Sequence, residues 1–165
     1  MTDVPLTKHR AKQVGHSLNV IAELPRYGDD AAFPVGLRVA AIDAFFIHLR
    51  LLIEFLIKKP DRAHPAIHRD DYASGFNLGS VDPALYRSLS SDFDFASQHV
   101  AHFSLNRVLT EESAGIEYFD AARLRTCAED VFGAMEAFIR YMHAKPGSYA
   151  DDFERLLSEA KSRMA

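Results

Sequence analysis

The polar residues best suited to chemistry gather in the segment 98–107, QHVAHFSLNR. His99 and His102 are three residues apart, so on a helix they lie about 60° from each other and could face one ligand. A metal-independent ribonuclease needs at least a histidine that transfers protons and a nearby arginine that binds phosphate. His102 and Arg107 are therefore the candidate catalytic residues. The alternative is structural: His102 packs between helices and Arg107 caps a helix C-terminus.

A metal site is the second chemistry that this histidine pair could support. Two histidines on one helix bind a metal only where further ligands converge on them. The side chains that could do so are His48, Glu54, His64, His68, Asp70 and Asp71. The chain has no Glu-x-x-His motif of the kind that di-iron bundles use, and eight histidines in 165 residues make chance pairs common. We therefore expect no metal ligands and no cofactor, with a metal-binding bundle as an alternative.

Four polar side chains interrupt the longest apolar run of the chain, residues 35–58. At 100° per residue, Asp43, Arg50 and Glu54 share one face of a helix, and Arg50 and Glu54 are spaced for an ion pair. This pair is either a surface feature or the floor of a groove beneath residues 59–82. His48 falls on another face, which we expect to be buried, and a hydrogen-bonded core histidine is the prediction there. That face also holds Ala41, Ala44, Leu51 and Phe55.

The short segment HRDDY, residues 68–72, places two acidic residues before an aromatic residue. Asp70 or Asp71 can cap a short helix. Alternatively, one of them pairs with Arg107 or with a histidine of the segment 98–107. The predicted binding residues are accordingly Asp71 and His99 together with Arg50 and Glu54.

These residues must be positioned by helices, and no segment requires a β-strand. Apolar spacing and capping residues predict helices at 7–24, 34–57, 83–90, 93–106, 119–143 and 149–164. Asp92 and Asp120 are the predicted caps of the helices 93–106 and 119–143. Residues 25–34 read as a loop, and residues 59–82 as a long irregular connection with room for a turn or two of helix near Asp70. The helix 34–57 would be about 36 Å long and forms the predicted core element.

Composition indicates one globular domain spanning residues 1–165, with 48% hydrophobic and 25% charged residues. A net charge of −4 gives no broad basic surface for nucleic acid, although RNA could still bind a small local patch. A single cysteine, Cys127, is expected to be a buried small hydrophobe in a reducing, cytoplasmic compartment. No membrane span is expected, because Asp43, Arg50 and Glu54 would each cost roughly 2.5–3.5 kcal/mol near a bilayer centre.

The order AIDAFFIHLRLLIEFL, DDY, HVAHFSLNR resembles a group of bacterial helical proteins that are distantly similar to HEPN (higher eukaryote and prokaryote nucleotide-binding) domains. This resemblance covers residues 35–140 and implies an all-α, antiparallel helical bundle of four main helices plus short ones. Many HEPN domains are dimeric ribonucleases of toxin–antitoxin or defence systems, with an active motif of arginine followed by histidine after four to six residues. Arg10–His16 and Arg62–His68 have that spacing here, and His102–Arg107 has it in reversed order.

Three functions follow as hypotheses. The first is a non-catalytic regulatory or interaction module of a bacterial stress or defence system, with a protein partner. The second is a HEPN-like ribonuclease that uses His102 and Arg107, and the third is a metal-binding bundle. We also expect a homodimer, in which the amphipathic N-terminal and C-terminal helices share a face between two copies.

Overall fold

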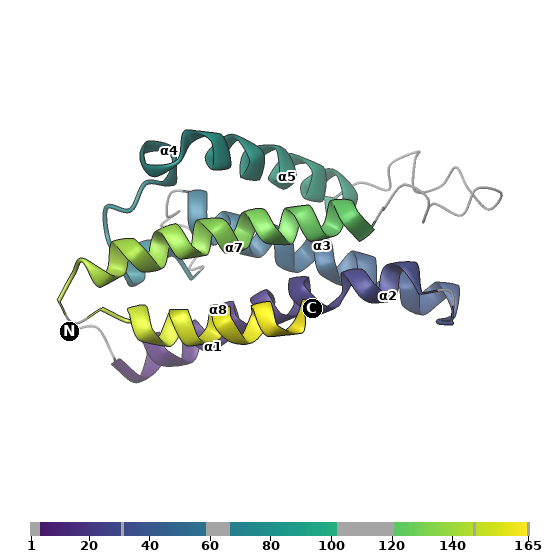
Figure 1. Cartoon of the computed structure of the whole chain (residues 1–165), viewed down its shortest axis with the longest axis horizontal. Helices are drawn as coiled ribbons and strands as arrows, with labels where there is room; N and C mark the ends of the chain where they lie inside the picture. The colour runs from purple at the N-terminus through teal and green to yellow at the C-terminus, as the bar shows by residue number, and fades with distance from the viewer. Residues whose placement is uncertain (1–3, 31, 59–66, 102–120, 147, 165) are drawn as a thin grey trace.

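The computed structural model describes residues 4–30, 32–58, 67–101, 121–146 and 148–164, and every regular element within these ranges is a helix (Figure 1). The all-α prediction is therefore confirmed. The elements are α1 (Val4–Glu23), α2 (Pro25–Asp29), α3 (Val35–Ile57), the 3-10 helix η1 (Arg69–Asp71), α4 (Leu78–Val81), α5 (Pro83–Ala101), α7 (Ala121–His143) and α8 (Ala150–Arg163).

The long helices pack as a bundle around α3 and α7, which lie across its middle (Figure 1). α5 covers one side of this pair, while α1 and α8 cover the other side and pack against each other. α3 is in contact with α1, α2, α5 and α7, and eight of its side chains are buried. The prediction that this helix is the core element is confirmed, and its large buried residues explain why the other helices gather on it.

The apolar stripes predicted for three other helices are buried as expected. They comprise Val14, Leu18, Ile21 and Ala22 on α1, Ala121, Leu124, Ala128, Val131, Met135, Phe138 and Met142 on α7, and Phe153, Leu156, Leu157 and Ala160 on α8. Helical spacing locates such stripes well, since each presents one continuous face to the core.

α1 and α8 use their apolar faces on each other within the chain. A Cβ atom at Gly15 of α1 would lie 2.5 Å from Cδ2 of Leu156 on α8, so a larger residue here would require the Leu156 side chain to move. The apolar faces of α1 and α8, which were expected to join two copies of the chain, are therefore in contact with each other around Gly15.

Two predictions about helix boundaries are wrong. Residues 83–90 and 93–106 do not form separate helices, because α5 runs without a break through Asp92. Asp92 is fully buried against the neighbouring helices and caps nothing. Asp82 is the residue that caps α5: its carboxylate accepts a hydrogen bond from the Leu85 amide at 3.0 Å.

The loop predicted at 25–34 contains the short helix α2, which begins at Pro25. Proline at the first helical position is compatible with a helix, since it has no amide hydrogen to leave unsatisfied there. The predicted cap Asp120 and the residues 102–106 of the expected helix lie outside the described residues.

Candidate functional site

A charged row lies along α3 where α5 crosses it. Arg50 and Glu54 form the predicted ion pair, with 3.4 Å between Arg50 Nε and Glu54 Oε1. Lys58, one turn further, approaches the same oxygen at 3.4 Å. The cations of Arg50 and Lys58 also lie over the ring of Phe93 from α5, at 5.5 and 3.8 Å from its centroid. Phe93 thus holds both cations beside one carboxylate through cation–π attraction.

A second polar contact joins the same two helices closer to the N-terminus of α3. Nε2 of His99 on α5 lies 2.9 Å from Oδ1 of Asp43. The imidazole packs at a tilt against the ring of Phe46, with ring centroids 4.5 Å apart and an interplanar angle of 43°, and Phe46 is in turn in contact with Phe95. A carboxylate that holds a histidine ring in one orientation is an arrangement used in proton transfer, and it equally serves to lock two helices together.

The structure therefore brings together part of the predicted site. The contact between α3 and α5 contains Arg50, Glu54 and His99. Asp43 shares a face of α3 with Arg50 and Glu54, and it is the direct partner of His99. Helical spacing predicts Asp43 on this face but does not pair it with His99. Phe93, Phe95 and His99 of α5 contact Arg50, Phe46 and Asp43 of α3, so the two helices run antiparallel. This pairing joins residues far apart in the sequence, and no local spacing signals it.

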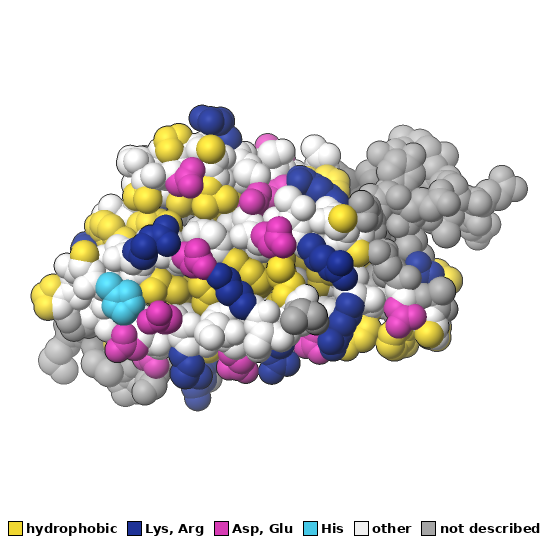
Figure 2. All heavy atoms as spheres, in the orientation of Figure 1, with side chains coloured by type: hydrophobic (Ala, Val, Ile, Leu, Met, Phe, Trp, Pro, Cys, Tyr) yellow, Lys and Arg dark blue, Asp and Glu magenta, His cyan; other side chains and the backbone are white. Residues whose placement is uncertain are grey.

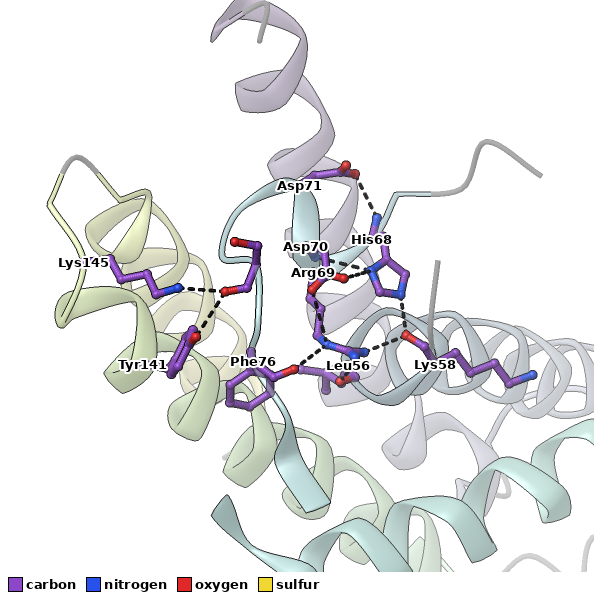
Figure 3. Close-up of polar contacts among 10 residues, drawn as sticks. Leu56, Lys58, His68, Arg69, Asp70, Asp71, Phe76, Tyr141 and Lys145 are labelled. Atoms are coloured by element: carbon purple, nitrogen blue, oxygen red, sulfur yellow. Dashed lines mark hydrogen bonds and ion pairs between the residues drawn. The ribbon is translucent and has the colours of Figure 1, made fainter. Parts of the chain in front are cut away.

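Asp71 belongs to a different structure, the cap at the C-terminal end of α3 (Figure 3). Its carboxylate accepts a hydrogen bond from the His68 amide at 3.0 Å, as part of a capping box at the start of the short helix η1. The prediction that Asp70 or Asp71 caps a short helix is confirmed for Asp71 in this form. Arg10 of α1 lies 4.0 Å from it. Asp70 pairs with His68 and Arg69, at 3.8 and 3.9 Å.

Arg69 is the residue at the centre of this cap, and it is not among the predicted site residues. Its guanidinium donates hydrogen bonds to the carbonyl oxygens of Leu56 at 3.0 Å, Lys58 at 2.6 Å and Phe76 at 3.1 Å (Figure 3). The last carbonyls of a helix have no partners within the helix, so Arg69 satisfies two of them with one side chain. The ring of His68 makes a further short contact with the Lys58 carbonyl.

His48 is turned away from α5 and toward α1. Its Nδ1 lies 3.0 Å from the hydroxyl of Ser17, and its ring meets the ring of His16 edge-on. Burial and the neighbouring His16 lower the pKa of His48. The predicted hydrogen bond is confirmed, but the face assigned to His48 is not buried throughout, because Leu51 is 51% exposed.

A buried acidic group connects α5 with α7. Asp92 is 0% exposed, and its Oδ1 accepts a hydrogen bond from the guanidinium of Arg123. Burial raises the pKa of Asp92, and the positive charge of Arg123 offsets this only in part. Cys127 is buried as predicted and lies beside the same carboxylate. Burial, together with the charge of Asp92, raises the pKa of Cys127 to about 12, so this thiol is not a reactive nucleophile.

Replacing Asp92 by asparagine is expected to remove a pH dependence of stability. The raised pKa means that the folded state binds this proton more tightly than the unfolded state does. The wild-type protein therefore loses stability from this group as the pH rises through the folded-state pKa. Urea denaturation should show Asp92→Asn to be more stable than wild type at pH 7 and similar to it at pH 4. Asp94→Asn, at an exposed position of α5, is the control; equal pH profiles for Asp92→Asn and wild type would contradict the prediction.

Metal-ligating side chains converge elsewhere than predicted. In the ranges that the structure describes, the group whose ligand atoms lie within 4.8 Å of one another consists of His143, Asp151 and Glu154, at the junction of α7 and α8. All three are exposed, and His143 pairs with Glu154 at 3.4 Å. The ion pair accounts for their proximity, and none of these residues was among the predicted ligands.

Apolar side chains also gather on the outer surface of α3. Leu37, Ile47 and Leu51 are 58%, 45% and 51% exposed. With the exposed Ala40 and the half-buried Ala44 they form one stripe, in which successive members are three or four residues apart. We call these five residues the α3 seam. It lies between the side of α3 that meets α5 and the side where His48 meets α1. Such spacing is typical of a helix that packs against another helix.

The candidate catalytic residues His102 and Arg107 lie outside the described residues, so their geometry is not part of this site. The chain has two arginine–histidine pairs with the family-like spacing. In the first pair, Arg10 approaches Asp71 and His16 faces His48. Arg62 of the second pair lies outside the described residues. On the face of the molecule shown in Figure 2, basic and acidic side chains alternate rather than gathering by sign. This face therefore lacks the basic footprint that marks nucleic-acid surfaces.

Comparison with known proteins identifies no relative of this chain. No protein-family model matches the chain, and no curated protein or solved structure shows significant similarity to it. In the described part of the chain, no helix combines the length and the apolar character needed to cross a membrane.

Proposed function

We propose that this chain is a non-catalytic interaction module, an antiparallel HEPN-like helical bundle that binds a protein partner through the outer surface of α3. The observation that carries the proposal is the α3 seam: three large apolar side chains, each about half exposed, in a single helical stripe on the central helix. Clustered exposed apolar groups mark interaction surfaces on soluble proteins, because a lone exposed leucine is ordinary but an aligned series of them is not.

The polar groups beside the seam support binding rather than catalysis. Arg50 is engaged with Glu54 and Phe93, and His99 is held between Asp43 and Phe46, with 14% of its side chain exposed. A general base must reach the proton that it abstracts. An imidazole that packs against a core phenylalanine and is bound to a carboxylate is better suited to fixing α5 on α3. Membership of a bacterial stress or defence system is part of the proposal and comes from the HEPN resemblance.

In-cell photo-crosslinking tests the binding face. A photoreactive amino acid introduced at Ile47 is expected to yield a discrete covalent adduct, since the partner would lie directly on this position. The same amino acid at Arg125, an exposed site on α7, serves as the control. Adducts from position 47 that are no more abundant than those from position 125 would overturn the proposed function.

An RNA-cleavage assay tests the alternative, a metal-independent ribonuclease. The Asp43–His99 contact is the observation that favours this alternative, because it orients a histidine close in sequence to His102 and Arg107. We expect purified protein to leave RNA intact in the presence of a chelator. Cleavage that is lost in both His99→Ala and His102→Ala, and retained in the surface variant His143→Ala, would replace the interaction module with an enzyme.

A further inference from the structure

We infer that the occupant of the α3 seam is a second copy of the same chain, lying antiparallel on α3. This inference rests on the proposed function, since it names the partner of that surface. It moves the expected homodimer contact away from α1 and α8, which pack on each other within one chain. Three features of α3 carry it: the spacing of the seam, the order of small and large residues along it, and the charges beside it.

The first feature is the spacing. From Leu37 to Leu51 the seam positions are separated by three, four, three and four residues. This is the repeat with which two helices keep a continuous line of contact along their length. Leu51 lies 14 positions after Leu37, so the seam is about 21 Å long, roughly four turns of helix.

The second feature is the distribution of side-chain size. The two small members, Ala40 and Ala44, are neighbours in the seam, and the large members Ile47 and Leu51 follow them. The third large member, Leu37, lies at the N-terminal end of the seam. An antiparallel pair therefore places Ala44 against Ile47 of the partner copy and Ala40 against Leu51 of the partner copy. Each of these layers then combines one small and one large side chain, which allows close packing without voids, and Leu37 lies beyond them at either end of the contact.

A parallel pair would pack the same residues less well. It would place Leu51 against Leu51 and Ala40 against Ala40, so that layers of large side chains at both ends would hold the two alanine layers apart and leave a gap between them. Gaps and overpacking both cost stability, because side chains cannot adjust freely in a close-packed contact. The order of residues along α3 thus favours the antiparallel arrangement.

The third feature is charge complementarity. Asp43 and Arg50 flank the seam on the side facing α5, with 31% and 35% of their side chains exposed. In the antiparallel register described above, Asp43 faces Arg50 of the partner copy, and the twofold symmetry repeats the contact. The dimer therefore gains two opposite-charge pairs at its rim, which fix orientation and register more than they add affinity.

The size of the contact sets the expected strength. Four turns of one helix provide less than the ~800 Å² per partner of a standard protein–protein interface. We therefore expect a dimer that dissociates in the micromolar concentration range. Sedimentation velocity on the full chain, from low to high micromolar concentration, should show the mass rising from that of one chain, 18.5 kDa, to twice that value.

Substitutions in and beside the seam should change this equilibrium selectively. Leu51→Glu is expected to raise the dissociation constant by roughly tenfold or more, since it places a charge against Ala40 of the partner copy. The matched control is Val81→Glu, at a side chain that is 55% exposed on α4 and outside the seam; it should leave the dissociation constant unchanged. Arg50→Asp should weaken the dimer, and the double variant Asp43→Arg/Arg50→Asp should restore it.

Engineered cysteines test the orientation directly. The pair Ala40→Cys/Leu51→Cys should form a covalent dimer on mild oxidation, because each cysteine faces the other position of the partner copy. Either single substitution should not, since like positions lie about 16 Å apart in an antiparallel pair. Covalent dimers from Ala40→Cys alone would overturn the antiparallel arrangement.

The outcomes separate this inference from the proposed function. A wild-type chain that remains monomeric at high micromolar concentration would overturn the second copy as occupant. If position 47 still yielded a photo-crosslink to a different protein in cells, the interaction module would stand with another partner. If neither self-association nor a crosslink from position 47 were observed, both would fail.

Discussion

Replacing Arg69 by methionine is expected to lower the free energy of unfolding by about 3 kcal/mol, because hydrogen bonds from a charged group contribute about 1.5–3 kcal/mol. The methionine would occupy the volume of the arginine stem and donate nothing. The carbonyls of Leu56, Lys58 and Phe76 would then lose their donor in a region where Arg69 itself is only 8% exposed. The cap that holds residues 67–76 to the end of α3 would be lost with them.

Urea denaturation monitored by circular dichroism measures this change. The control is Arg125→Met, which removes an exposed arginine from α7 and should change stability by less than about 0.5 kcal/mol. Arg69→Lys is a useful second variant: a lysine keeps the charge but cannot direct a planar fork at three carbonyls, so it should fall between the two. A loss below about 1 kcal/mol in Arg69→Met would mean that solvent satisfies these carbonyls.

Replacing Phe138 by alanine is expected to be the most damaging single change, with a loss of about 3–5 kcal/mol. Phe138 of α7 is 0% exposed and makes ring contacts with Phe55 of α3, Phe76 and Phe153 of α8. Its removal would leave a cavity where three parts of the chain meet. Neighbouring rings can fill such a cavity only in part, because each is held edge-on or stacked by the others.

The thermal midpoint should fall by about 2–4 °C for each kcal/mol lost in a chain of this size. Tyr86→Ala, at an aromatic residue of α5 that is 38% exposed, is the matched control and should have a much smaller effect. Phe138→Leu should lie between them, since it retains most of the apolar volume. Equal midpoints for Phe138→Ala and Tyr86→Ala would show that the ring cluster is not a centre of stability.

Most of the helical architecture could be read from residue spacing. The stripes of α1, α7 and α8 are regular over several turns, and helical periodicity is a strong local signal. The boundaries between helices could be predicted less accurately. The sequence Ser90-Ser91-Asp92 has the character of a helix start, but Asp92 lies within α5, where Arg123 from α7 partners it. Such a long-range partner leaves no trace in the local pattern.

The candidate site could be predicted only in part for the same reason. Arg50 and Glu54 lie on one helix, so their ion pair follows from spacing alone. The contact of Asp43 with His99 joins residues 56 positions apart, and it depends on how α5 crosses α3. Arg69 is the clearest omission, since only the fold shows that its guanidinium reaches three carbonyl oxygens.

Residue spacing was thus enough to locate the long helices α1, α3, α7 and α8, to identify the apolar face of most of them, and to show that α3 is the central element. Helical periodicity and capping are properties of neighbouring residues, so no tertiary information is needed for them. The tertiary structure alone decided which side of α3 stays uncovered. Leu51 and Ile47 are as apolar as the buried Leu49 and Leu52, and they are exposed because α1 and α5 pack on the other sides of the helix.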